Sequence, residues 1–154
     1  LVEPEAALSE AAKMPGLDGQ KMSKSYGNTI SLRDTPEEVE QKVRRMPTDP
    51  ARVRRDDPGT PEKCPVWELH KVYSDEERQQ WVKQGCTSAG IGCIDCKMPV
   101  IEAMEKELAP MRERAQEFDS QPDLVQSIIE EGNERAREQA RDTLREVRQV
   151  MGLV

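Results

Sequence analysis

The sequence has few aromatic residues, one histidine and no long apolar run. Aromatic side chains make up 3% of the 154 residues and hydrophobic side chains 35%. This composition allows one modest core or two small ones, and it disfavours a large sheet-based enzyme domain. No apolar stretch approaches the roughly 20 residues that cross a bilayer, and the N-terminus lacks a basic segment followed by an apolar one. We therefore expect a cytoplasmic protein without membrane contacts.

Positive charge is also in deficit, because 23 Lys and Arg residues face 30 Asp and Glu residues, for a net charge of −7. Such acidity disfavours a chain-wide nucleic-acid surface, so any RNA contact must be local. The candidate basic regions are Arg44, Arg45, Arg52, Arg54 and Arg55, and a helical stripe of Arg137, Arg141, Arg145 and Arg148. Three of the stripe's arginines follow an acidic residue by three positions, in the pairs Glu134/Arg137, Glu138/Arg141 and Asp142/Arg145, which favours a solvated face there. The first residue is not methionine, which suggests a piece of a longer polypeptide.

Strand-like sequence is nearly absent, and residues 28–32 are the only candidate. Helix signals are frequent: Thr35-Pro36 with Glu38 forms a capping box, and Ser74 with Glu77 predicts a second one. We expect the helix after the last cysteine to bend or break near Pro110. A further break is expected at residues 132–133, before an amphipathic last helix. The fold class is therefore predicted to be mainly α, and residues 48–61 form the best internal boundary.

A short basic loop carries the clearest chemistry. Residues 16–28 place two lysines and two serines within five positions, flanked by glycines that let the backbone approach a ligand. Lysine ammonium groups can follow negative charge along a polyphosphate, and serine hydroxyls add small donors. From composition alone a solvated loop remains a good alternative. The residues concerned are Lys21, Met22, Ser23, Lys24 and Ser25.

The order of these five residues, KMSKS, resembles the signature of class I aminoacyl-tRNA synthetases, and the frame PGLDGQKMSKSYGNTISL resembles the tryptophanyl-tRNA synthetase family. The segments TDPARVRRDDPGTPEKCPVW, CIDCK and ARDTLREVRQVMGLV extend the resemblance along essentially the whole chain. It implies that residues 21–25 bind ATP, used with Mg²⁺, that Met22 packs near the adenine, and that Lys21 and Lys24 act on the phosphates. Lys24 is the residue expected to contact the transition state.

The resemblance also implies a division of the chain. Residues 1–34 would be the edge of a catalytic domain with the KMSKS loop, and residues 35–154 a helical domain that binds the anticodon of tRNA(Trp). The expected substrates are ATP and L-tryptophan, and the full-length enzyme is expected to be a homodimer. The family's nucleotide-binding half and its HIGH-type motif are not found here, and His70 lies in the unrelated sequence ELHK. This chain alone should therefore not activate tryptophan.

Four cysteines form a single cluster in the sequence, spaced C-x21-C-x6-C-x2-C. Two disulfides, a metal site and buried free thiols are all compatible with four cysteines, but a reducing compartment favours a metal. Thiolates bind both Zn²⁺ and iron–sulfur clusters, so the spacing leaves the metal open. The family resemblance implies a [4Fe-4S] cluster, with Zn²⁺ as the alternative. The proposed ligands are Cys64, Cys86, Cys93 and Cys96.

Two other functions remain compatible with these observations. One is a free-standing, metal-stabilised helical RNA-binding module without catalysis. The other is a structural helical adaptor whose cysteines hold zinc. The aromatic residues between the cysteines, Trp67, Tyr73 and Trp81, are expected mainly to pack around the metal site, and base stacking by Trp67 or Trp81 is the less favoured interpretation.

Overall fold

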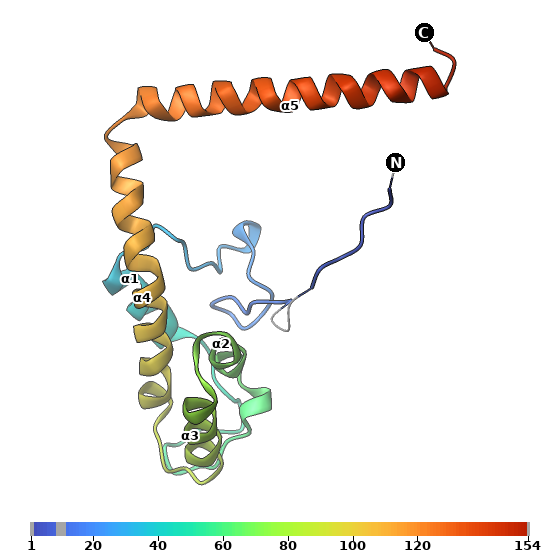
Figure 1. Cartoon of the computed structure of the whole chain (residues 1–154). Coiled ribbons are helices and arrows are strands. Elements are labelled where there is room, and N and C mark those ends of the chain that lie inside the picture. The colour runs from blue at the N-terminus through green and yellow to red at the C-terminus, as the bar shows by residue number, and fades with distance from the viewer. Residues whose placement is uncertain (1, 9–11, 154) are drawn as a thin grey trace. The chain divides into compact units, whose positions relative to one another are not determined.

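A computed structural model describes residues 2–8 and 12–153 of the chain (Figure 1). These residues form five α-helices and two short 3-10 helices, and no β-strand occurs among them. The mainly α prediction is confirmed. Within the described residues, every helix is too short or too polar to span a bilayer. The elements are η1 (Lys24–Tyr26), α1 (Pro36–Arg45), η2 (Pro61–Lys63), α2 (Pro65–Tyr73), α3 (Glu76–Thr87), α4 (Cys93–Asp119) and α5 (Pro122–Val150).

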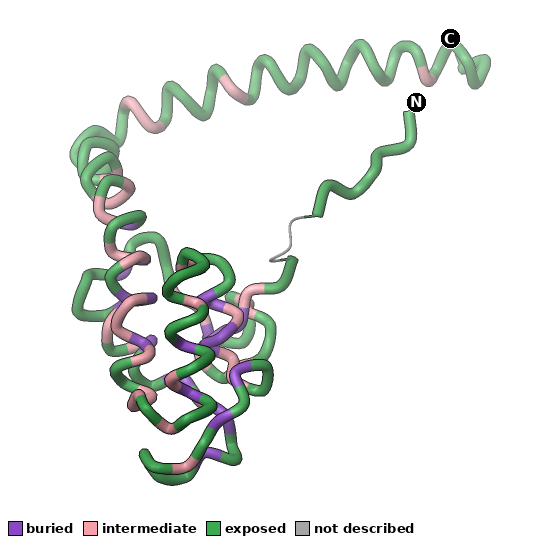
Figure 2. Tube along the Cα trace, turned by 60° about the horizontal axis from the view of Figure 1, so that its bottom comes forward, coloured by how far each residue is buried: buried purple, intermediate pink, exposed green. Residues whose placement is uncertain are grey.

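The chain divides into two compact units, Leu1–Met111 and Arg112–Val154. All buried residues of the described chain lie in the first unit, as the purple segments of Figure 2 show. The second unit holds the end of α4 and the whole of α5, and α5 has no buried residue. The first unit therefore contains the core and every candidate site discussed below.

The core is built from one face each of α1, α2 and α4. These faces are aliphatic, and the largest fully buried apolar side chain is Leu69 of α2. The loop before α1 adds Met14, Leu17 and Ile30, which pack against the core while partly exposed. An aliphatic core of this kind fits the scarcity of aromatic residues. Its buried members are Val39, Val43, Met46, Val66, Leu69, Val100, Ile101, Met104 and Leu108.

Helix starts follow the local sequence signals with one shift. The capping box at α1 is confirmed, because Thr35 Oγ1 accepts from the Glu38 N–H and the Glu38 carboxylate accepts from the Thr35 N–H. The second predicted box is wrong by one residue. Asp75, not Ser74, caps α3, and its carboxylate accepts from the Arg78 N–H. Ser74 ends α2 instead, and its hydroxyl hydrogen-bonds a buried histidine.

Two expected interruptions and the candidate strand are not found. Helix α4 continues through Pro110, and α5 continues through Gly132. A single glycine costs about 1 kcal/mol in a helix, and the strong helix formers around Gly132 offset it. In α4, the core contacts of the preceding turns outweigh the hydrogen bond that proline removes. Residues 28–32 are irregular, since Ser31 and Asp34 close a turn there through mutual hydrogen bonds.

Truncating the core tests this packing. We expect Leu69→Ala, at a fully buried position, to lower the free energy of unfolding by about 2–5 kcal/mol because it removes methyl groups and leaves a cavity. Leu32, which is 62% exposed, supplies the control, and Leu32→Ala should change stability by less than about 0.5 kcal/mol. Urea unfolding followed by the fluorescence of buried Trp67 measures both variants. Similar losses for the two would contradict the assigned core.

Candidate functional site

The basic loop is mounted on a small hairpin. The Met22 N–H donates to the Met14 carbonyl at 2.8 Å, and the Gly16 N–H donates to the Gln20 carbonyl at 2.6 Å. Gly19 closes the turn with φ of +80°, a conformation that favours glycine. The KMSKS residues follow directly, and residues 24–26 form η1. The hairpin thus fixes the start of the loop against the first unit.

Asn28 is the hub of this loop and was missed by sequence reasoning. It is 4% exposed, and its side-chain oxygen accepts from the Ser23 N–H at 2.8 Å. Its amide nitrogen donates to the Asp18 carboxylate at 2.7 Å and to the Lys21 carbonyl at 3.2 Å. The bond from the Asn28 amide, together with one from the Gln20 N–H, lowers the pKa of Asp18, because both favour its charged form. Gly16 has room only for hydrogen, since a Cβ there would overlap the Asn28 side chain.

The functional groups of the loop face solvent. Lys21 and Lys24 are exposed, and neither ammonium group pairs with an acidic side chain in the described part of the chain. Ser23 and Ser25 hydrogen-bond each other through their hydroxyl groups at 2.8 Å. Met22 is partly buried. An ordered backbone with two exposed, unpaired ammonium groups is a suitable arrangement for binding a polyphosphate.

All four cysteines line one small cavity in the first unit. Cys93 and Cys96 lie in the first turn of α4, Cys86 in the last turn of α3, and Cys64 immediately before α2. The cavity volume is about 20 Å³. The structure therefore brings together the four residues that the spacing selected, although the described residues contain no formed group of three or more metal-binding side chains.

Two buried cations border the same cavity. Arg52 is 8% exposed and Lys97 3% exposed. The Arg52 guanidinium donates to the carbonyls of Arg55 and Ile91 and approaches Cys86 Sγ at 4.0 Å, while its buried Nε has no partner among the described residues. Sulfur donors beside two buried positive charges fit a metal–thiolate centre, whose net charge is negative. The donor set is thus chemically suited to such a centre.

Burial favours the neutral form of Cys64, Cys86 and Cys96. Burial raises the pKa of Cys64 and Cys86, and burial together with the other cysteines raises the pKa of Cys96 to about 12. A metal must displace these protons, so its binding would couple to pH. The single histidine lies alongside, since Nε2 of fully buried His70 donates to the Cys96 carbonyl at 3.1 Å. Burial lowers the pKa of His70 to about 4, which leaves the ring neutral.

The basic regions proposed for RNA are altered by the structure. Arg52 is not a surface residue, because its guanidinium is used inside the cysteine cavity, so that region loses its central member. The stripe on α5 is solvated as expected: Arg137 pairs with Glu134 and Arg145 with Asp142. Arg141 approaches Glu134 and not the expected Glu138. The two tryptophans differ in exposure: Trp67 is buried, whereas Trp81 is 42% exposed.

Comparisons with known proteins identify the same family that the KMSKS sequence resembles. The family described as tRNA synthetases class I (W and Y) matches residues 2–109. The chain is 59% identical to a tryptophan–tRNA ligase of Ralstonia nicotianae and 52% identical to one of Thermotoga maritima, each over 153 residues. These alignments cover 99% of this chain but 38% and 47% of the relatives. The chain thus spans less than half the length of these relatives.

Solved structures give the same result. The tryptophanyl-tRNA synthetase of Campylobacter jejuni, complexed with ADP and tryptophan, superposes with a TM-score of 0.74 at 28% identity, covering 97% of this chain and 47% of that one. The corresponding enzyme of Aeropyrum pernix gives a TM-score of 0.58 at 32% identity over 70% of this chain. The family match, the curated relatives and the fold agree: the chain belongs to the tryptophanyl-tRNA synthetase family, within the class I tRNA synthetases.

Proposed function

We propose that this chain is the part of a tryptophan–tRNA ligase that supplies the KMSKS phosphate loop and recognises the anticodon of tRNA(Trp). Residues 1–34 form the edge of the catalytic domain in this proposal, and residues 35–154 form the tRNA-binding region. The observation that carries it is the complete KMSKS sequence on an ordered hairpin, with both ammonium groups exposed, in a chain of this family. The curated relatives named above are tryptophan–tRNA ligases.

The charged residues of the loop would neutralise the leaving group of the first reaction step. In adenylate formation, the carboxylate of tryptophan attacks the α-phosphate of ATP, and the bond to the bridging oxygen breaks to release pyrophosphate. Negative charge accumulates on the leaving group, where bound Mg²⁺ would supply further neutralisation. Lys21 and Lys24 are placed on a hydrogen-bonded loop from which they can bind these oxygens, and Ser23 and Ser25 support its shape. The Asn28 side chain positions this loop through its hydrogen bonds to the backbone of Ser23 and Lys21.

The remaining steps require the rest of the enzyme. In this proposal Met22 packs near the adenine, and the other contacts to ATP and the binding of the indole ring are assigned to the part of the relatives that this chain does not span. Transfer of the activated tryptophan to tRNA(Trp) follows, and the complete enzyme is proposed to act as a cytoplasmic homodimer. This chain alone is proposed to bind tRNA without forming the adenylate.

We further propose that the four cysteines hold a metal centre, a [4Fe-4S] cluster with Zn²⁺ as the alternative. The shared cavity and its two buried cations support this proposal. When bound, such a centre would cross-link α2, α3 and α4 through sulfur. Cross-linking of this kind stabilises a small aliphatic core, because the binding free energy of the metal becomes folding free energy.

The catalytic proposal is tested with Lys24→Ala in the full-length enzyme. Adenylate formation, measured by pyrophosphate exchange, should slow by roughly 10²–10³-fold because a charge contact made in the transition state is lost. The KM for tryptophan should change little. Lys13→Ala, at an exposed lysine before the hairpin, is the control and should behave as wild type. An unchanged rate for Lys24→Ala would remove the proposed role.

Asn28→Ala tests whether the loop must be held in place. We expect a smaller loss of pyrophosphate exchange than for Lys24→Ala, together with a higher KM for ATP, because the charges remain but the backbone around Ser23 loses its partner. Asn28→Asp keeps the accepting oxygen but loses the donated bonds, so it should recover part of the activity. The ATP dependence of the two variants is the measurement. Wild-type ATP kinetics in Asn28→Ala would show that the hub has no functional role.

Metal analysis of anaerobically purified protein tests the cysteine centre. A [4Fe-4S] cluster predicts four iron and four sulfide per chain with broad visible absorbance, whereas zinc predicts one colourless ion. Cys86→Ser should lose the metal and lower thermal stability, while Thr87→Ala, at an exposed neighbour, should retain it. Chelation should destabilise the wild type and leave Cys86→Ser unaffected. Protein that contains neither iron nor zinc would refute the proposal.

A further inference from the structure

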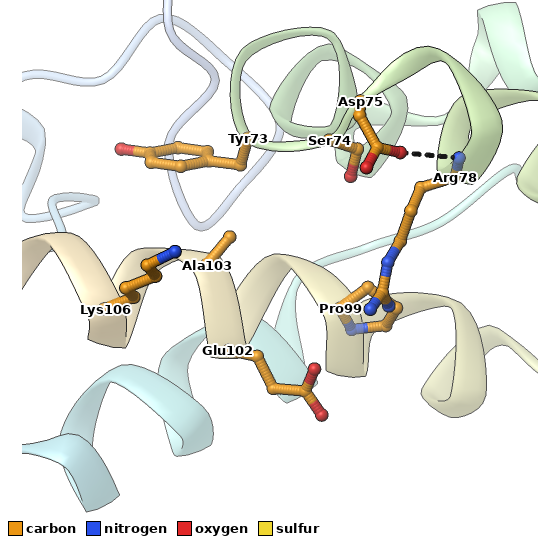
Figure 3. Close-up of a pocket in the computed structure, with 8 residues that line it drawn as sticks. All are labelled: Tyr73, Ser74, Asp75, Arg78, Pro99, Glu102, Ala103 and Lys106. Atoms are coloured by element: carbon orange, nitrogen blue, oxygen red, sulfur yellow. Dashed lines mark hydrogen bonds between the residues drawn. The ribbon is translucent and has the colours of Figure 1, made fainter.

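A hollow in the first unit lies between the end of α2, the start of α3 and the side of α4, away from the KMSKS loop and outside the cysteine cavity. Its volume is about 290 Å³, close to the lower limit of small-molecule sites. Figure 3 shows its walls: Tyr73 and Arg78 enter from opposite ends, and Lys106 reaches from α4 towards the tyrosine ring. Glu102 stands at the rim. The hollow thus combines a flat ring, a flat guanidinium, an amine and a carboxylate.

A second hollow adjoins the first. It has a volume of about 470 Å³ and shares Asp75 and Arg78 with its neighbour, while Glu77 and Trp81 complete its lining. Arg78 therefore borders two hollows, one with Tyr73 and the other with Trp81. Trp81 is 42% exposed in a chain whose other tryptophan is buried. Its ring is therefore accessible to a ligand in the second hollow.

The chemistry of these walls matches unpaired nucleobases. Single-stranded RNA is bound by stacking of its bases on aromatic rings and guanidinium planes, and by hydrogen bonds to base edges. Carboxylates such as Glu102 accept from the exocyclic amine of cytosine. Acidic side chains balance Arg78 and Lys106 here, so the surface does not suit a ligand held by charge alone, such as an acidic peptide. Bases, read by their faces and edges, suit it better.

The wall between the hollows is fixed from inside the protein. The Ser74 hydroxyl donates to His70 Nδ1 at 2.8 Å, and the Nε2–H of the same ring donates to the Cys96 carbonyl at 3.1 Å. The ring is fully buried and neutral. The turn that carries Asp75 is therefore tied to the first turn of α4, where two of the cysteines lie. Such a support holds the stacking groups in place before a ligand arrives, which lowers the cost of binding.

We propose that the two hollows around Arg78 bind neighbouring unpaired bases of the anticodon loop, with Tyr73 and Trp81 as stacking surfaces and Glu102 reading a base edge. This inference deepens the proposed function and depends on it, because it names the surface on which anticodon recognition takes place. The tryptophan codon UGG pairs with the anticodon CCA, whose two cytosines carry the amine that a carboxylate accepts.

Binding of an RNA stem-loop with the anticodon CCA, measured by fluorescence anisotropy at fixed salt, tests the inference on the whole chain. Trp81→Ala and Arg78→Gln should each weaken binding about 5- to 100-fold, the range expected for one lost base stack. Trp81→Phe should recover most of the affinity. The controls are Phe118→Ala, at an aromatic residue that is also 42% exposed, and Arg114→Gln, at an exposed arginine; both should bind as wild type.

The salt dependence adds a signature that misfolding would not produce. Trp81→Ala should weaken binding equally at all salt concentrations, because stacking releases no counterions. Circular dichroism confirms that each variant remains folded. If the wild type prefers CCA to a loop with changed anticodon bases but the Trp81 and Arg78 variants bind equally well, the assigned surface is wrong while the proposed function stands. If the wild type shows no preference, anticodon recognition by this chain is refuted, and this inference with it.

An acidic peptide is the competing ligand, and the intrinsic fluorescence of Trp81 decides between them. Stacking of a base should quench this emission and protect it from acrylamide, whereas buried Trp67 should not respond. Trp81→Phe provides the baseline. Quenching by an oligoglutamate peptide without any by the RNA would overturn the assignment of the two hollows to nucleobases.

Discussion

The buried ammonium group of Lys97 is the interaction on which the first unit depends. Its Nζ donates to the carbonyls of Arg44 and Met46 at 2.7 Å each, and so satisfies the end of α1, where backbone acceptors lack helical partners. A charge that is 3% exposed is tolerated only with such partners. The result is a fixed register between α1 and α4. Contacts between aliphatic side chains are not directional, so they alone would fix the position of α4 along α1 less precisely.

The first turns of α4 extend this arrangement to both candidate sites. Lys97 and Cys96 are adjacent, so the residue that fixes α4 against α1 stands next to a sulfur in the shared cavity. His70 then links Cys96 to Ser74, which lines the first of the two hollows around Arg78. One short helical segment thus sets the positions of the cysteines and of the turn before α3. In the proposals above, a metal centre at the cysteines would therefore also stabilise the turn that lines the hollows.

How well the sequence predicts a feature of this structure depends on how far apart in the chain the interacting residues are. The capping box at Thr35 follows from residues close in the chain, and this prediction is confirmed. The four cysteines line one cavity, and their role as metal ligands stays a prediction. The roles of Lys21 and Lys24 stay predictions, because they concern a ligand. The continuation of α4 through Pro110 is a tertiary effect, since core contacts elsewhere decide it.

The buried polar residues show the same limit more clearly. Arg52 belongs by sequence to a basic surface, but the loop of residues 48–61 folds it inward onto carbonyls at position 55 and, 39 residues away, at position 91. Asn28 stands in an ordinary loop sequence, and only the fold shows that it holds Ser23 and Lys21. In each case a buried polar side chain satisfies backbone groups that the fold brings to it. Local sequence patterns do not show which backbone groups will be close to a side chain in the folded protein.

The family match ends close to the boundary between the two compact units of the chain. The family matches residues 2–109, and the first compact unit ends at Met111. The KMSKS loop, the cysteine cavity and both hollows lie inside those limits, so the chemistry of this chain is concentrated where the buried core can position it. Helix α5 buries none of its side chains and relies on local ion pairs such as Arg137 with Glu134, each worth only a few tenths of a kcal/mol. Precise placement of reactive groups requires a packed scaffold, which is why a solvated helix of this kind is a poor position for them.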